Sequence, residues 1–242
     1  MNPRLLLATA GRVLAQLRHD HRTIGLLVGV PTLLMTLLWW IYDGGGVFDQ
    51  AGPPLLGIFP MVIMFLITSV TMLRERTTGT LERLMTMPIR RADLVLGYAV
   101  ALGFAALLQT AVVATFSIWA LDLQVAGPEW MLLLISVLSA VLGVTMGLAA
   151  SSLARTEFQA VQFMPALLFP QFLLCGLLVP RDQMPAAAEA ISDVLPLSYA
   201  VDAVKEVAVA PDPTIWPEVL VIGAFIIGLL ALGILSLRRR SA

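Results

Sequence analysis

Few residues of this 242-residue chain are of types that do catalytic or ligand chemistry. His19 and His21 lie together near the N-terminus, Cys175 is the only cysteine and Lys205 is the only lysine. A lone cysteine forms neither an intrachain disulfide nor a CxxC metal or redox pair. We therefore expect no disulfide scaffold, no zinc module and no bound metal.

The same residues argue against several membrane activities. A P-loop needs G-x-x-x-x-G-K-[ST] to hold phosphates, whereas Lys205 follows Val204. An intramembrane serine protease needs a histidine at membrane depth, and a zinc protease needs H-E-x-x-H; the sequence has neither. A coupled carrier usually places an ionisable residue inside a span, and the long apolar segments contain none. We expect no catalytic residues and no cofactor bound by this chain.

Composition identifies the elements that must position whatever site exists. Apolar residues make up 59% of the chain and charged residues 13%, against about 25% charged in soluble domains. The mean hydropathy is +0.90. The net charge of −1 gives no basic excess for a nucleic-acid partner. The chain is predicted to be a membrane protein.

Six segments free of Asp, Glu, Lys and Arg are long enough to cross a bilayer as helices, which takes roughly 20 residues. A barrel strand would instead show about ten alternating residues. The sequence predicts an all-α membrane protein, with a single transmembrane domain over residues 1–242 and six transmembrane helices. The predicted spans are Thr23–Tyr42, Gln50–Leu73, Leu94–Leu121, Trp130–Ala154, Phe158–Pro180 and Val219–Leu237.

The basic residues outside these spans are distributed very unequally. Thirteen of the fifteen lie before the first span, in the segments 74–93 and 155–157, or after the last span. Arg181 and Lys205 are the two on the other side. Because cytoplasmic loops carry the excess of Lys and Arg, both termini and the loop 74–93 are predicted to be cytoplasmic.

Residues 1–22 have an amphipathic helical pattern, with arginines opposite an apolar face. Arginines recur through the segment, so a cleavable signal peptide is not expected. The pattern predicts a helix in the cytoplasmic interface with its apolar face in lipid. The alternative is an amphipathic helix packed on another part of the protein. The apolar face would contain Leu6, Leu7, Ala10, Val13, Leu14 and Leu17.

The segment 74–93 carries five arginines and the pattern of a short helix. Leu81, Leu84 and Met85 are spaced i, i+3, i+4, so a helix would place them on one face. Gly79 permits a turn before it, and Pro88 would end it. Such a helix suits docking to a soluble partner. The alternative is a solvated loop whose arginines follow the positive-inside rule.

The segment 181–214 is too polar to span and too apolar to be a free linker. Apolar residues follow Pro185 on one helical face, Pro196 interrupts the chain, and Ser198 is placed to cap a second helix that runs to about Val209. We expect two short re-entrant helices between spans five and six, buried in protein. The alternative is an amphipathic helix on the outer leaflet.

Span five carries a stripe of aromatic residues with a glutamine, at steps of four and three residues. Pro165 and Pro170 are expected to kink the helix. The stripe suits contact with a bulky, mostly apolar solute, and the alternative is packing between helices. It contains Phe158, Gln162, Pro165, Phe169, Phe172 and Gly176.

Two motifs resemble the membrane subunits of type-2 ABC transporters, the permeases of drug, polysaccharide and lipid exporters. The first is E-x-x-x-G-T-L-E-x-L-x-x-x-P in the cytoplasmic loop. The second, between spans five and six, places Gly176, Pro180 and Met184-Pro185 before Leu195-Pro196-Leu197-Ser198-Tyr199-Ala200. Lys205 stands where many members carry arginine. The first motif consists of Glu75, Gly79, Thr80, Leu81, Glu82, Leu84 and Pro88.

The resemblance implies a pair of six-helix subunits bound to two copies of a separate P-loop ATPase, which would bind ATP and Mg²⁺. The first motif would seat in that ATPase and couple it to the spans. Arg155 and Glu157, between spans four and five, would add a second contact; the alternative for these two is a helix-end pair. Pro185, Pro196 and Tyr199 would belong to an outer gate.

The resemblance also implies that spans two and five enclose a central cavity. Phe158, Gln162, Phe169 and Phe172 would line it from span five. Residues of span two would lie opposite, namely Met61, Met64, Phe65 and Thr68.

The leading prediction is a permease subunit of an ATP-driven exporter in the cell membrane, acting on an amphiphilic drug-like or lipid-like solute. The alternative from another class is a self-sufficient secondary carrier or channel. The predicted partners are the ATPase, a second permease copy (identical or related) and the lipid bilayer. No nucleic acid is expected.

Overall fold

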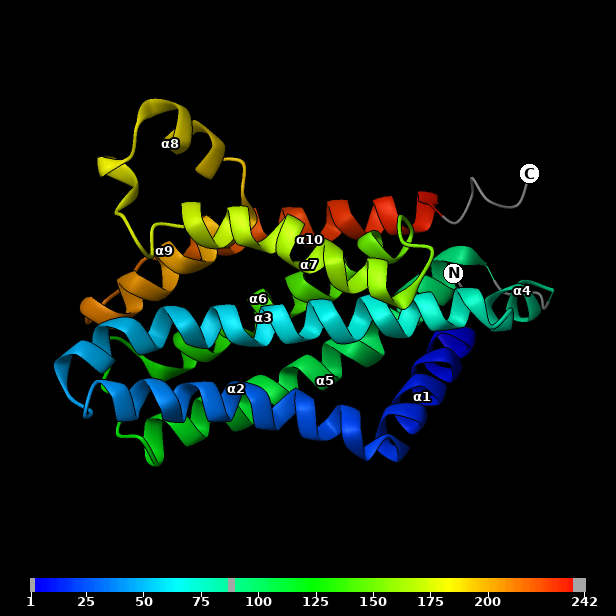
Figure 1. Cartoon of the computed structure of the whole chain (residues 1–242), viewed down its shortest axis with the longest axis horizontal. Coiled ribbons are helices and arrows are strands. Elements are labelled where there is room, and N and C mark those ends of the chain that lie inside the picture. The colour runs from blue at the N-terminus through cyan, green and yellow to red at the C-terminus, as the bar shows by residue number, and fades with distance from the viewer. Residues whose placement is uncertain (1–2, 87–89, 237–242) are drawn as a thin grey trace.

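The computed structural model describes residues 3–86 and 90–236, and within them all side chains except those of Glu82, Met85 and Ser236. The described part is helical, without strands (Figure 1). Its helices are α1 Pro3–His19, α2 His21–Ile41, α3 Gly46–Thr77, α4 Thr80–Met85, α5 Arg91–Trp119, α6 Glu129–Ser151, α7 Glu157–Leu174, the 3₁₀ turn Arg181–Gln183, α8 Ala186–Ser192, α9 Pro196–Val209 and α10 Trp216–Ser236.

Five of these helices, α2, α3, α5, α6 and α10, are long and apolar enough to span a membrane. The sixth predicted span is not confirmed as one, because its helix α7 ends at Leu174, before the apolar residues that lead to Pro180, and contains Glu157, three glutamines and two prolines. Gly176 then adopts φ +84°, a left-handed conformation that a helix does not continue through. At about 1.5 Å per residue, the 18 residues of α7 cover about 27 Å, just under the hydrocarbon thickness of about 30 Å.

Helices α3 and α6 form the centre of the bundle. In each of them, 61% of the residues in the apolar stretch that could cross a membrane are buried. Gly143 and Gly147 of α6 allow the close approach: a Cβ at Gly143 would lie 2.2 Å from the carbonyl oxygen of Met61, and one at Gly147 would lie 2.7 Å from that of Phe65. This G-x-x-x-G spacing puts both glycines on one face. Helices α2 and α10 lie at the periphery, where only 17% and 11% of the residues in the corresponding stretches are buried.

Helix α1 packs on α5 rather than lying wholly in lipid. Ala10 and Val13 are buried, and a Cβ at Gly97 of α5 would lie 2.7 Å from the Cβ of Thr9. Leu7, from the same predicted apolar face, remains 62% exposed. The structure therefore combines the two alternatives: α1 covers part of the protein and leaves an apolar edge free for lipid.

The two ends of the bundle differ in chemistry. Helices α1 and α4 lie at one end, and α8, α9 and the α2–α3 turn lie at the other (Figure 1). Every tryptophan lies at the α8–α9 end, at helix termini where a membrane interface favours the indole ring. These residues are Trp39, Trp40, Trp119, Trp130 and Trp216.

Candidate functional site

The predicted coupling segment begins where α3 ends. Gly79 has φ +73°, so the chain turns there from α3 into α4 through a conformation that glycine adopts without strain. The hydroxyl groups of Thr78 and Thr80 lie 3.0 Å apart across this turn. Pro88 lies outside the described residues, and only the backbone of Glu82 is described. The turn holds α4 beside the end of α3.

The apolar face of α4 is half-buried on its own subunit. Leu81 and Leu84 are partly buried and pack against the hydrophobic cluster that includes Met72 of α3 and Leu94 of α5. Arg83, on the same helix, is exposed. Among the side chains of α4 that the structure describes, the two leucines therefore face the protein and Arg83 faces outward.

Glu75, the first residue of the motif, faces into the protein. Its Oε1 lies 3.0 Å from Nη1 of Arg12, and its side chain is 8% exposed. Arg12 also donates to the hydroxyl of Tyr98, and its guanidinium lies 5.6 Å from the centre of that ring. The triad of Arg12, Glu75 and Tyr98 joins α1, α3 and α5. The amphipathic pattern predicts arginines opposite the face of the helix that packs, whereas Arg12 points toward Glu75 and Tyr98 of the protein.

The second predicted contact, the loop before α7, is bound to the end of α3. Arg74 Nε lies 2.7 Å from Oε1 of Glu157, and Nη2 lies 3.1 Å from Oε2. Thr156 caps α7 by accepting a hydrogen bond of 3.2 Å from the backbone N–H of Gln159. Arg74 lowers the pKa of Glu157 by donating to its carboxylate. Glu157 therefore pairs with Arg74 of α3 rather than with Arg155, the partner expected at the helix end, which is exposed.

Helix α7 presents most of its predicted stripe on an open face. Phe158 is 73% exposed, Phe169 is 58% exposed and Gln162 is exposed. Phe172 packs in part against the main hydrophobic cluster. The open face of α7 is therefore available to a solute, to lipid or to a second subunit.

The residues predicted to lie opposite on α3 are placed differently. All four point away from the surface and are fully buried, and Phe65 and Thr68 lie against Gly147 of α6. A role in lining a cavity requires another conformation, and it stays a prediction. The partly open face of α3 instead carries Val62, Leu66, Val70 and Arg74. The buried four are Met61, Met64, Phe65 and Thr68.

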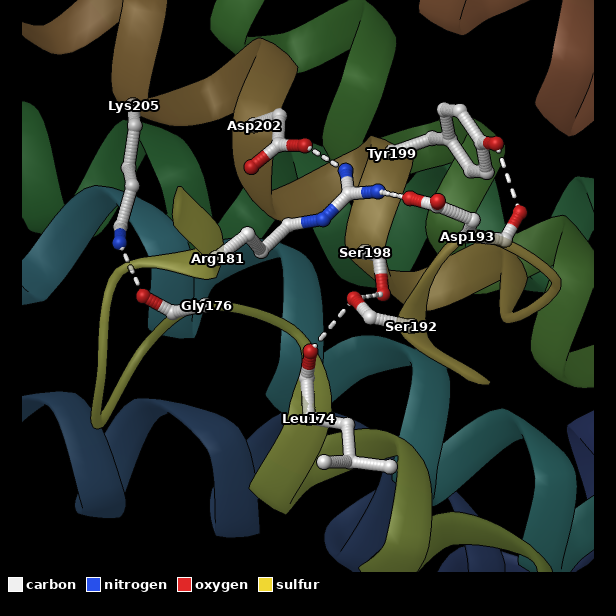
Figure 2. A network of polar contacts seen from close by, with 9 residues as sticks. All are labelled: Leu174, Gly176, Arg181, Ser192, Asp193, Ser198, Tyr199, Asp202 and Lys205. Carbon is white, nitrogen blue, oxygen red and sulfur yellow. Dashed lines mark hydrogen bonds and ion pairs between the residues drawn. The ribbon is translucent and has the colours of Figure 1, made fainter. Parts of the chain in front are cut away.

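The outer segment forms a polar network around Arg181 (Figure 2). The two terminal nitrogens of Arg181 bind Asp193 and Asp202, so one side chain joins the end of α8 to α9. Tyr199 donates a hydrogen bond of 2.7 Å to the carbonyl oxygen of Asp193. Lys205 donates to the carbonyl oxygen of Gly176. The network ties both outer helices to the end of α7.

Helices α8 and α9 are placed differently. Pro196 begins α9, whose buried face packs against α3, α6 and α10, whereas Pro185 precedes α8, where Ile191 is 51% exposed. The predicted burial of two helices in protein thus applies to α9; its depth in a membrane stays a prediction. Ser198 does not cap α9, because the helix begins at Pro196 and its N-cap residue is Leu195, which places Ser198 inside the first turn. Its hydroxyl lies 2.9 Å from that of Ser192.

Comparison with known proteins decides the family. A family model described as ABC-2 type transporter matches residues 5–208, most of the chain.

The chain belongs to the ABC-2 type transporter family.

Individual relatives agree with this assignment. The chain is 28% identical over 155 residues to the probable multidrug ABC transporter permease YbhR of Escherichia coli (strain K12), covering 64% of this chain and 42% of that protein. It is 29% identical over 159 residues to the probable multidrug ABC transporter permease YbhS of the same organism, covering 65% and 42%. Identity to ABC transporter G family member 20 of Dictyostelium discoideum is 24% over 196 residues, covering 79% and 27%. The matches thus span less than half of each relative.

Family membership makes this multi-pass chain the membrane part of a transporter. In the described part of this ABC-2 chain, no cluster of three or more His, Cys, Asp and Glu side chains is arranged to hold a metal. Three arginines organise the site, namely Arg12, Arg74 and Arg181. From the sequence alone they contribute only to the charge asymmetry that predicts the orientation in the membrane. Their helical spacing gives no signal, because each binds a partner far away in the chain.

Proposed function

We propose that this chain is the membrane subunit of an ATP-driven exporter of amphiphilic solutes, working with two copies of a separate P-loop ATPase and a second permease copy. ATP and Mg²⁺ would bind the ATPase. Both termini and α4 would face the cytoplasm, in agreement with the charge asymmetry of the loops. The multidrug names of two bacterial relatives support a solute of this class.

The observation that carries the proposal is the ion pair of Arg74 with Glu157. It connects the two segments predicted to meet the ATPase, the α3–α4 turn and the loop before α7. A partner that pushes on either segment would therefore move the inner ends of α3 and α7 together. These helices also bear the open stripe of α7 and the partly open face of α3.

Copurification from the native membrane in mild detergent tests the proposal. We expect a stoichiometric soluble subunit with a P-loop. Its recovery should fall severalfold in Arg83→Glu, which reverses an exposed charge on α4, and persist in Arg18→Glu, the same reversal at an exposed position of α1. Recovery of the chain alone, with transport in liposomes that lack ATP, would instead establish a secondary carrier or channel.

A further inference from the structure

A cavity of about 530 Å³ lies between α1, α2 and α3, near the turn into α4. This volume falls in the range of about 300–1,000 Å³ that is usual for small-molecule sites. Residues from α5 and α7 complete the wall. The lining includes Asp20, Leu26, Leu66, Val70, Arg74 and Glu75.

The wall of this cavity is divided by polarity along the helices. Asp20 and Glu75 lie at the end near α4. One to three helical turns farther along the same two elements, α2 and α3, the wall becomes Leu26, Leu66 and Val70. A molecule that fills the cavity would therefore place a polar head at the α1–α4 end and an apolar tail toward the middle of the bundle.

The polar end carries a negative excess. Arg74 lines it together with Asp20 and Glu75, and Arg74 is bound to Glu157. Asp20 accepts hydrogen bonds from the backbone N–H and the hydroxyl of Thr23, which leave its charge in place. With the charge of Arg12 set against Glu75, the formal sum over these five groups is −1.

Glu75 supplies a second, independent indication of a ligand. Its side chain is 8% exposed, and Oε1 is bound by Arg12. Oε2 is buried and accepts no hydrogen bond from Arg12 or Gln16, which bind Oε1, while the hydroxyl of Tyr98 interacts with the same carboxylate. A buried carboxylate oxygen without a donor is unfavourable, so an ammonium N–H that reaches it would be favoured.

We propose that this cavity is a binding site for amphiphiles with a primary alkylammonium head. The head lies between Asp20 and Glu75, and the tail lies along Leu26, Leu66 and Val70. The site is independent of the proposed exporter function, since its occupancy requires neither ATP nor a partner subunit.

Equilibrium binding of radiolabelled dodecylammonium, whose N–H groups can donate to a carboxylate, to the full chain in dodecyl maltoside micelles tests the proposal, with protein-free micelles subtracted. We expect saturable binding at one site per chain, and no saturable binding of dodecyl sulfate, which has the same tail and the opposite charge. Saturable binding of both probes with equal affinity, or of neither, would overturn the proposal.

Three variants locate the site. Asp20→Asn removes a charge but keeps a good helix cap, and it should weaken binding about threefold, the effect of a solvated charge pair. Asp43→Asn makes the same change in the α2–α3 turn and should leave binding unchanged. Val70→Trp should fill the cavity and weaken binding more than tenfold. Full affinity in both Asp20→Asn and Val70→Trp would overturn the assignment; if Val70→Trp fails to fold, Asp20→Asn decides.

Competition identifies the natural source of the ligand. Phosphatidylethanolamine or phosphatidylglycerol is added to the micelles at equal mole fraction. Competition by the amine lipid alone supports the proposal with a bilayer lipid as the occupant, and competition by neither supports it with a soluble cationic amphiphile. Competition by phosphatidylglycerol would contradict the charge preference on which the proposal rests.

Discussion

Arg74 and Glu157, 83 positions apart in the sequence, form a two-pronged ion pair with distances of 2.7 and 3.1 Å. The pair joins the last turn of α3 to the first turn of α7. Both side chains are more than half exposed, so the pair is worth at most about 1 kcal/mol to folding. Its value lies in geometry: it fixes the distance between two segments that we expect to meet the same partner.

Breaking this pair should affect transport more than stability. We expect Glu157→Gln to lower solute-stimulated ATP hydrolysis severalfold in the assembled transporter while the midpoint of thermal unfolding moves by only a few degrees. Arg74→Glu combined with Glu157→Arg restores the opposite charges and should recover much of the activity. Equal loss in the single and double variants would mean that the individual residues, rather than their pairing, are required.

The pair should also be lost in acid. Arg74 lowers the pKa of Glu157, so the pair contributes its full stability above the ordinary pKa of a glutamate and loses it as pH falls through the lower folded value. Activity that depends on the pair should therefore be constant from pH 7 to pH 5. Titration of the Glu157 carboxyl by NMR would check this; a midpoint above the ordinary glutamate pKa of about 4.3 would contradict it.

The pair of Arg12 with Glu75 should matter for folding instead. Arg12→Gln leaves the charge of Glu75 buried without its partner, which costs about 3 kcal/mol when such a pair is broken. Arg18→Gln, at an exposed position on the same helix, should cost less than about 0.5 kcal/mol. Denaturant titration in micelles would compare them. Similar losses would show that α1 is held by its apolar face alone.

The crossing of α3 and α6 should not tolerate one added methyl group. Gly143→Ala places a Cβ against the backbone of Met61, and we expect a loss of about 3 kcal/mol or failure to assemble. Gly228→Ala, on α10 where no atom lies within 4 Å, should be neutral or stabilising by up to about 1 kcal/mol. Yield and unfolding midpoint of the two variants give the comparison. A folded Gly143→Ala protein of unchanged stability would require a looser crossing.

The open stripe of α7 should influence which solutes act on the transporter. Phe169→Ala removes an aromatic ring that is 58% exposed, so stability should change by less than about 1 kcal/mol. We expect the set of solutes that stimulate the partner ATPase to change, and to change again in Gln162→Ala. Identical solute profiles in both variants and in the parent chain would assign the stripe to lipid or subunit packing.

Sequence patterns predicted the positions of the helices well, because apolar length and prolines act locally. Gly79 and the helix after it were found for the same reason. Which face of each helix is buried was harder to predict. Met61 and Phe65 were expected at a cavity, but Gly143 and Gly147 draw that side of α3 onto α6, and such pairing depends on contacts between distant segments. Arg181 likewise resembled a plain loop charge until the fold placed Asp193 and Asp202 around it.

Because all five tryptophans lie at the α8–α9 end, the tryptophan fluorescence of the native protein reports on that end of the bundle. Changes in the outer helices or at that membrane boundary would alter it, whereas events confined to α1 and α4 would pass unseen. The 32 residues of α3, about 48 Å long at about 1.5 Å per residue, separate the two ends. A single indole introduced on α4 would therefore be observed against a background that comes entirely from the opposite boundary.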